Sequence, residues 1–255
     1  MSRPLAGRRA AVRPSPIFLG IVAVWLAGGA MAYYEFGNPT VNVLLFVLAG
    51  WVVSLSLHEF SHALFAYRSG DHSVAGRGYL TLNPLKYTHP LLSIGLPLLF
   101  LLLGGIGLPG GAVWVDRGAV RGRLNASLIS LVGPGANIVF LLVLAAPFVA
   151  GVDTDAHPTF WAAVAFLAFL QLTAAVLNLL PVPGLDGGNA VRPWLSGDLA
   201  KIFDVMMPFG LLVLFGLLFE PHLNEAFFSV VRALTDAVGI PRSLAADGWD
   251  LLRFW

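Results

Sequence analysis

Cysteine is absent from this chain of 255 residues, and charged residues are scarce. Without cysteine there is no disulfide and no thiolate, so any metal site must use His, Asp or Glu. Charged residues make up 11% of the sequence and apolar residues 57%, whereas a soluble domain has about 25% charged residues. So few charges cannot cover a water-facing surface, and lipid must face much of it. The net charge of +1, with no basic stripe, argues against nucleic acid as a partner.

Long apolar runs recur along the chain and predict an all-α membrane protein that crosses the bilayer several times. A spanning helix needs about 20 residues, most of them apolar. We expect about five spanning helices plus one re-entrant or sixth helical segment, with a short β-like loop as an option after the second run. The runs are 14–34, 36–67, 91–115, 124–152, 156–185 and 205–219.

Lys and Arg near the ends of these runs predict the orientation of the chain. Four arginines precede the first run, so 1–13 is expected to be a cytoplasmic basic N-terminus. No convincing cleavage site follows, and the first run is expected to be retained as a helix. The transmembrane domain then covers 14–219, and the mixed tail 220–255 has room for an amphipathic helix.

The run 91–108 decides on which side the later loops lie. If it crosses the bilayer, the arginines between 117 and 123 are outside. If it dips in and returns, they stay in the cytoplasm, as the charge rule prefers. Its prolines and glycines suit a broken path, which is tolerated at depth where the backbone packs in protein or lines a cavity.

The sequence His58-Glu59-Phe60-Ser61-His62 lies within the second apolar run and predicts a metal site. On a helix, positions i and i+4 share a face, so both imidazoles can reach one tetrahedral ion. Glu59 can reach a water on that ion. Ionisable residues at this depth cost about 2.5–3.5 kcal/mol each on insertion scales. The competing interpretation is a buried polar cluster that hydrogen-bonds between helices.

A catalytic zinc usually has three protein ligands, and Asp186 is the best candidate for the third. It is the only acidic residue between Asp155 and Asp198, and it follows a helix break at Pro181 and Pro183. The alternative is an ordinary loop aspartate that caps the next helix. To reach the histidines, Asp186 must lie at the same side of the bilayer, which again favours a re-entrant 91–108.

Over about 44–193 the chain resembles the site-2 protease family of intramembrane zinc metallopeptidases (M50 type). The resemblance rests on His58–His62, on the Asn-x-x-Pro-x-Pro-x-x-Asp-Gly run at Asn178–Gly187, on Thr81–Leu85 and on Gly133–Asn137. It implies that His58, His62 and Asp186 bind Zn²⁺, that Glu59 is the catalytic glutamate, and that Asn178 binds the substrate backbone or the developing oxyanion.

The resemblance also implies a function, namely an intramembrane metalloendopeptidase with its opening towards the cytoplasm. We expect it to hydrolyse peptide bonds in or near transmembrane segments of membrane-protein substrates, by zinc-activated water with Glu59 as general base. Two alternatives stay open: a non-proteolytic zinc carrier or sensor, and a zinc hydrolase that acts on a lipid.

Two residues depart from the family pattern, and a third has an expected structural role. Tyr87 and His89 stand where many members of the family have His and Asp, which puts the role of that segment in doubt. Asn137 is expected to support helix packing and interhelical hydrogen bonding rather than catalysis.

Overall fold

The computed structural model describes residues 12–87, 95, 98–99 and 113–253. This part of the chain is helical and contains no strand, so the predicted all-α class is confirmed and the β-like loop does not occur in it. The elements are α1 Pro16–Tyr33, α2 Pro39–Arg68, α3 Ser73–Gly76, the 3₁₀ turns η1 Tyr79–Thr81 and η2 Pro84–Lys86, α5 Arg123–Val149, α6 Pro158–Leu179, α7 Asp186–Val191, η4 Arg192–Trp194, α8 Gly197–Met206, η5 Met207–Phe209, α9 Gly210–Phe219, α10 Pro221–Ala237 and α11 Arg242–Leu252.

Among the described residues, α1, α2, α5 and α6 are long and apolar enough to cross a membrane. The chain is therefore an integral membrane protein. Segment 91–108 lies almost entirely outside the described residues, so the choice between re-entry and spanning stays a prediction.

The apolar run 205–219 does not form one long helix. It breaks at the η5 turn, and α9 has only 10 residues, which is half of what a spanning helix needs. A Cβ on Gly210 would lie 2.0 Å from the carbonyl oxygen of Pro183. The start of α9 is therefore pressed against the bend between α6 and α7, and Pro208 just before it cannot supply a backbone N–H to a continuous helix.

Two spanning helices begin at residues that their sequences favour. The side chain of Asn38 accepts a hydrogen bond from the backbone N–H of Val41, and Pro39 occupies the first position of α2. Ser15 caps α1 in the same way, and Pro16 follows it. Such caps satisfy backbone donors that have no partner within the helix, and proline at the first position sacrifices no hydrogen bond.

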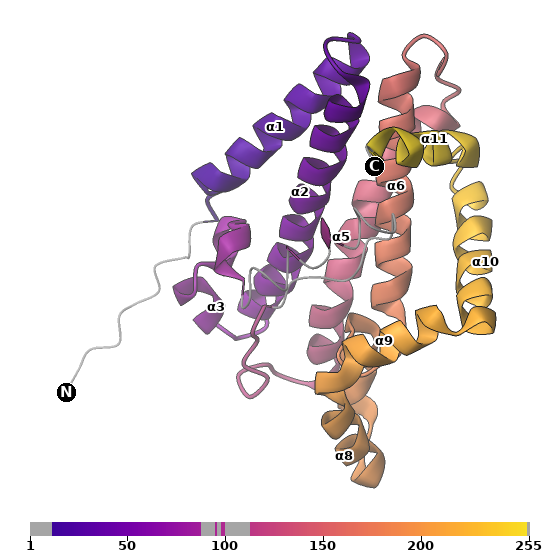
Figure 1. Ribbon diagram of the computed structural model, residues 1–255. Helices are drawn as coiled ribbons and strands as arrows, with labels where there is room; N and C mark the ends of the chain where they lie inside the picture. The colour runs from indigo at the N-terminus through magenta and orange to yellow at the C-terminus, as the bar shows by residue number, and fades with distance from the viewer. Residues whose placement is uncertain (1–11, 88–94, 96–97, 100–112, 254–255) are drawn as a thin grey trace.

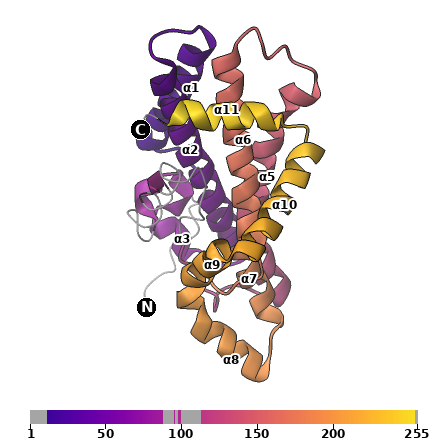
Figure 2. The same ribbon diagram turned by 45° about the vertical axis from the view of Figure 1, so that its right-hand side comes forward.

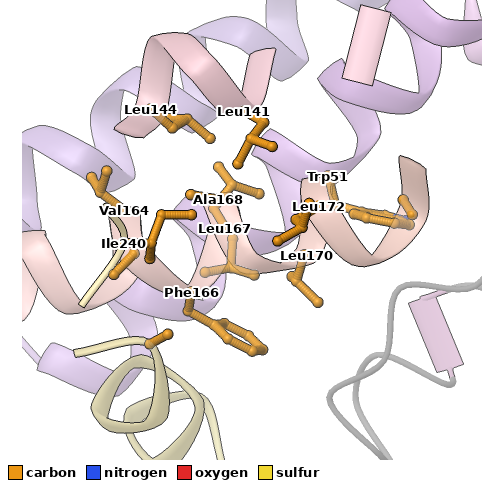
Figure 3. Packing of buried hydrophobic residues seen from close by; sticks show 14 of the residues in the cluster. Trp51, Leu141, Leu144, Val164, Phe166, Leu167, Ala168, Leu170, Leu172 and Ile240 are labelled. Carbon is orange, nitrogen blue, oxygen red and sulfur yellow. The ribbon is translucent and has the colours of Figure 1, made fainter. Parts of the chain in front are cut away.

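Helix α6 lies at the centre of the bundle, packed against α2, α5 and α11 (Figure 1). The side chains of Leu167, Leu170 and Leu177 along it are fully buried. Figure 3 shows Leu167 and Leu170 in one apolar cluster with Trp51 of α2 and Leu141 of α5. This core fixes the relative positions of the three helices that surround the candidate site.

The tail 220–255 contains two helices, α10 and α11, rather than one. Helix α10 lies beside α6, and α11 crosses α6 near the end at which α6 begins (Figure 2). A Cβ on Gly248 would lie 2.2 Å from the carbonyl oxygen of Ala162, so the crossing is close. Phe227, Val231 and Leu252 are buried in the same core as the central helices, and the tail is therefore part of the folded bundle.

Candidate metal centre

His58 and His62 lie one turn apart on the same face of α2, as their spacing predicts. Both are buried, and their Nε2 atoms are 3.0 Å apart. Neither side chain depends on a loop for its position, because α2 is continuous from Pro39 to Arg68.

The other ring nitrogen of each histidine is held by α5. The Nδ1–H of His58 donates to Oδ1 of Asn137 at 2.5 Å, and that of His62 donates to the backbone oxygen of Ile129 at 2.5 Å. Because these acceptors take the proton on Nδ1, both Nε2 atoms present lone pairs on the same side. Hydrogen bonds of this kind fix the tautomer and the ring orientation of metal-binding histidines.

Asn137 is itself oriented by a buried polar network that joins three helices. Its Nδ2 group donates to Oγ of Ser54 on α2 and to Oε1 of Gln171 on α6, both at 2.9 Å. The Ser54 hydroxyl also donates to Oε1 of Gln171. With both amide hydrogens used, only Oδ1 of Asn137 is left to face His58. Asn137 makes the interhelical bonds expected of it, and in addition contacts a site histidine.

Asp186 is the first residue of α7, and its carboxylate lies against the two imidazoles. Its Oδ2 is 3.0 Å from Nε2 of His58 and 3.4 Å from Nε2 of His62. The N-terminal position of α7 before it is Leu185, and no side chain of the described residues caps this helix. The capping alternative for Asp186 therefore finds no support, and the three sequence-predicted ligands come together.

The donor set fits a metal ion. Oδ2 of Asp186 is buried and has no hydrogen-bond donor among the described residues, while the two facing Nε2 atoms offer lone pairs. Three acceptors that face one another repel unless a cation lies between them. Zn–N and Zn–O bonds of about 2.0–2.1 Å in a tetrahedron place neighbouring donors about 3.3 Å apart. The observed spacings of 3.0–3.4 Å agree with that value.

Backbone contacts set the position of α7. A Cβ on Gly187 would lie 2.2 Å from the carbonyl oxygen of Leu179, and one on Gly188 would lie 2.0 Å from that of Val182. Only glycine allows the first turn of α7 to fold back this closely on the bend after α6. The glycines at 187 and 188 therefore set the position of Asp186 relative to His58 and His62.

Two hydrogen bonds through the side chain of Ser127 join α5 to α7 and to Trp194, which follows it. The indole N–H of Trp194 donates to the hydroxyl of Ser127 at 2.8 Å, and that hydroxyl donates to the backbone oxygen of Ala190 at 2.6 Å. Ser127 lies two residues before Ile129, whose carbonyl accepts from His62. The same stretch of α5 thus contacts both the histidine side and the aspartate side of the site.

Gly133 is a functional position that the sequence pointed to only as a packing residue. A Cβ there would lie 2.2 Å from Nε2 of His62 and 2.7 Å from Nε2 of His58. Helix α5 therefore passes directly over the imidazole nitrogens, and any side chain at this position would occupy the metal site. The Gly-Pro-Gly-Ala-Asn run was the available signal.

Glu59 lies beside the histidines and is buried. Its carboxylate, together with His58 and His62, forms a group whose candidate ligand atoms lie within 4.8 Å of one another. One carboxylate oxygen, Oε2, accepts a hydrogen bond of 3.0 Å from the backbone N–H of Val113.

Tyr87 fills the position where many members of the family have histidine. It is buried, and its hydroxyl donates to the backbone oxygen of Ser56 at 3.0 Å. Burial raises the pKa of the Tyr87 phenol, and the nearby carboxylate of Glu59 raises it further. Tyr87 therefore stays a neutral hydrogen-bond donor near Glu59, whereas His89 lies outside the described residues.

Asn178 lies in the last turn of α6 and is buried. Its side chain makes no hydrogen bond with any other part of the chain that the structure describes. The role of Asn178 stays a prediction.

Known proteins similar to this chain are named as metalloproteases. The chain is 49% identical to the "Putative zinc metalloprotease Rip2" of Mycolicibacterium smegmatis, over 99% of this chain and 97% of that protein. It is also 49% identical to the protein of the same name in Mycobacterium tuberculosis, over 98% and 97%. Identity to the "Putative zinc metalloprotease YwhC" of Bacillus subtilis is 26%, over 77% and 90%. No protein-family model and no solved structure matches the chain.

Proposed function

The chain belongs to the site-2 protease family of zinc metalloproteases, and we propose that it is an endopeptidase that hydrolyses peptide bonds in or near the transmembrane segments of other membrane proteins. One observation carries the proposal: Oδ2 of Asp186 lies 3.0 and 3.4 Å from the Nε2 atoms of His58 and His62. Glu59 lies in the same buried group. Two histidines, one carboxylate and an adjacent glutamate are the parts of a hydrolytic zinc site.

The cofactor is zinc, which Nε2 of His58, Nε2 of His62 and Oδ2 of Asp186 would hold. When bound, zinc supplies a Lewis acid for the scissile carbonyl and lowers the pKa of a water molecule towards about 7. Asn137 and the carbonyl of Ile129 keep the protons of the two imidazoles on Nδ1, so that both rings stay available as ligands.

Glu59 is the general base. Because Oε2 accepts the N–H of Val113, Oε1 is the oxygen left to take a proton from the attacking water. The same oxygen then returns the proton to the leaving amine. Asn178, whose amide has no hydrogen-bond partner among the described residues, would donate to the developing oxyanion.

The proposed catalytic core covers about 44–193 within a transmembrane part that covers 14–219, and its opening faces the cytoplasm. The site lies about 28 Å along α2 from its start, by the helical rise, which is close to the thickness of the hydrocarbon core, about 30 Å. Arg68 follows at the end of the same helix, and Lys86 and Arg121 lie in the segments near it. The loop 150–157 at the other end has two aspartates and no Lys or Arg, as expected outside.

The proposal is tested with the full chain purified in detergent and reconstituted in liposomes. A panel of membrane-spanning peptides and a panel of lipid esters are offered, with and without a chelator. We expect peptide cleavage that the chelator abolishes and zinc restores, and no ester hydrolysis. Ester hydrolysis without peptide cleavage would favour a lipid hydrolase.

Glu59→Gln separates the enzyme from a zinc carrier. The amide preserves the shape of the side chain but accepts no proton, and general base catalysis contributes about 10²–10⁴-fold. We expect one zinc per chain with cleavage reduced by that factor. A Gln variant as active as the parent chain would refute the role of Glu59.

A further inference from the structure

A non-helical segment that precedes α5 ties the end of α2 to the candidate site. We call residues Val113–Ala119 the strap. At its start, the backbone N–H of Val113 donates to Oε2 of Glu59 at 3.0 Å. Three residues later, the backbone N–H of Asp116 donates to Oδ2 of Asp71 at 2.8 Å. The strap is therefore hydrogen-bonded to Glu59 at its start and to Asp71, just after the end of α2, three residues later.

Asp71 differs from a surface aspartate in that it is buried and both of its carboxylate oxygens accept hydrogen bonds. It is 1% exposed. Its Oδ1 accepts from the backbone N–H of Ser73 at 2.9 Å and from the Ser73 hydroxyl at 2.6 Å, while Oδ2 accepts from Asp116. The described part of the chain offers it no ion pair. A buried carboxylate is costly unless hydrogen bonds satisfy it, and here both oxygens are needed to satisfy donors on two separate segments.

Gly70 holds the other end of the strap. Its φ is +119°, and a Cβ on it would lie 2.7 Å from the carbonyl oxygen of Ala119. The Asp116 side chain closes the turn between these points, because its Oδ1 accepts from the N–H of Gly118 at 2.9 Å. Gly70 and Asp71 together thus fix both ends of the stretch from 116 to 119 against the end of α2.

We propose that Asp71 is a positioning residue for the reaction, which it serves by holding the strap so that the N–H of Val113 fixes one oxygen of Glu59. The inference rests on the proposed function. Val113 and Asp116 are separated by at most about 11 Å of extended chain, so a strap released at Asp116 no longer holds Val113 in register. Glu59 then loses the donor that leaves Oε1 as its reacting oxygen.

The test uses Asp71→Asn in the full chain in liposomes. Ser73 and Asp116 face different oxygens of Asp71. In asparagine an NH2 group replaces one of these oxygens, so the side chain can accept from Ser73 or from Asp116 but not from both. The matched control is Ser73→Ala, which removes a donor to the same carboxylate and leaves the Asp116 bond intact. Gly70→Ala is a second route to the same displacement, since a Cβ would push on Ala119. Each variant is measured for zinc content, for kcat and KM on a cleaved peptide, and for backbone hydrogen exchange in 113–119.

For Asp71→Asn we expect one zinc per chain and backbone hydrogen exchange that is faster in the strap than in α2 or α5. We expect kcat to fall about tenfold and KM to change less than about twofold, because small misplacements of catalytic groups act on the chemical step. Gly70→Ala should follow it, and Ser73→Ala should stay within about twofold of the parent. Unchanged kcat with fast strap exchange would overturn the inference, and so would loss of zinc together with faster exchange throughout the bundle. If the parent chain cleaves no peptide, the proposed function fails, and exchange alone still reports whether Asp71 holds the strap.

Discussion

The two sides of the candidate site are built by different means. His58 and His62 lie on a continuous helix, and each is oriented by a hydrogen bond from its own ring to α5. Asp186 lies at the start of α7, six residues long, which is positioned by close backbone packing at Gly187 and Gly188. The histidine side thus depends on hydrogen bonds from the two rings and on the space left by Gly133, whereas the aspartate side depends on close backbone packing at two glycines.

This difference indicates which substitutions each side tolerates. A change of hydrogen-bonding capacity should weaken the histidine side without moving the backbone. An added methyl group should displace the aspartate side without altering any ligand. Helix α5 serves both sides, through Asn137 and Ile129 on one and through Ser127 on the other, so it is the element whose disturbance should have the largest effect.

Gly133→Ala is expected to have the largest effect of the substitutions that compare the two sides. Its Cβ would fall 2.2 Å from Nε2 of His62, so α5 or the imidazoles must move. We expect zinc affinity to fall on the order of 100-fold, the upper end of the effect of losing a ligand's supporting partner. Competition with a chelating dye measures it. Gly135→Ala on the same helix meets nothing within 4 Å and should bind zinc like the parent.

Gly187→Ala tests the aspartate side by itself. The added Cβ would meet the Leu179 carbonyl at 2.2 Å, and overpacking of this kind costs about 1–3 kcal/mol. We expect α7 to shift and zinc affinity to fall about tenfold or more, while both imidazoles keep their bonds to α5. Gly76→Ala, which meets nothing within 4 Å, is the control. Zinc affinity equal to that of the control would contradict the role given to the close packing of α7.

Asn137→Leu tests the histidine side. It removes the acceptor for Nδ1 of His58 and leaves Ser54 and Gln171 without their shared partner. We expect about a tenfold loss of zinc affinity, measured by the same competition assay. Asn125→Ala on α5 removes an amide whose one hydrogen bond within the described residues goes to the carbonyl of Arg121, and it should not change zinc affinity. Equal affinities for both variants would mean that the ring of His58 is held without Asn137.

Asp204→Asn should have the smallest effect. Asp204 is paired with Arg192 beyond α7, and the hydrogen bond from that guanidinium lowers the pKa of the Asp204 carboxyl. A lowered pKa contributes stability that is present above the ordinary value of about 3.9 and is lost as the pH falls through the lowered value. The pair lies at the surface and is screened by salt, so zinc binding and thermal unfolding near neutral pH should stay almost unchanged. A large loss of zinc would place this pair in the support of α7.

The histidine side of the site was predictable from the sequence, because a spacing of four residues on a helix brings His58 and His62 to the same face. The approach of Asp186 to these histidines was also predictable, since an acidic residue after a helix break among glycines is unusual in so apolar a chain. Its role as a metal ligand stays a prediction. The contribution of Gly133 and the tie between Asp71 and the strap were not predicted. They depend on contacts between segments 45 to 75 residues apart, which no local pattern encodes.

The fold was predictable to a similar extent. Apolar runs predicted α1, α2, α5 and α6 to within three residues at each end, except that α6 ends six residues before its run does. The run 205–219 did not form one helix, because it breaks at the η5 turn, where Pro208 coincides with the close contact between Gly210 and the carbonyl of Pro183. Hydropathy measures how much apolar surface a segment can bury. It does not show where contact with another segment bends the chain.

X-ray absorption at the zinc edge of the purified chain tests the central claim most directly. We expect one zinc per chain with two imidazole nitrogens and a carboxylate oxygen at about 2.0–2.2 Å, and one imidazole fewer in His58→Ala or in His62→Ala. Glu59→Gln should leave the imidazole and carboxylate ligands unchanged, and Asp186→Ala should lose the carboxylate. A parent spectrum with fewer than two imidazoles, or an Asp186→Ala spectrum identical to that of the parent, would contradict the convergence of these three side chains on one ion.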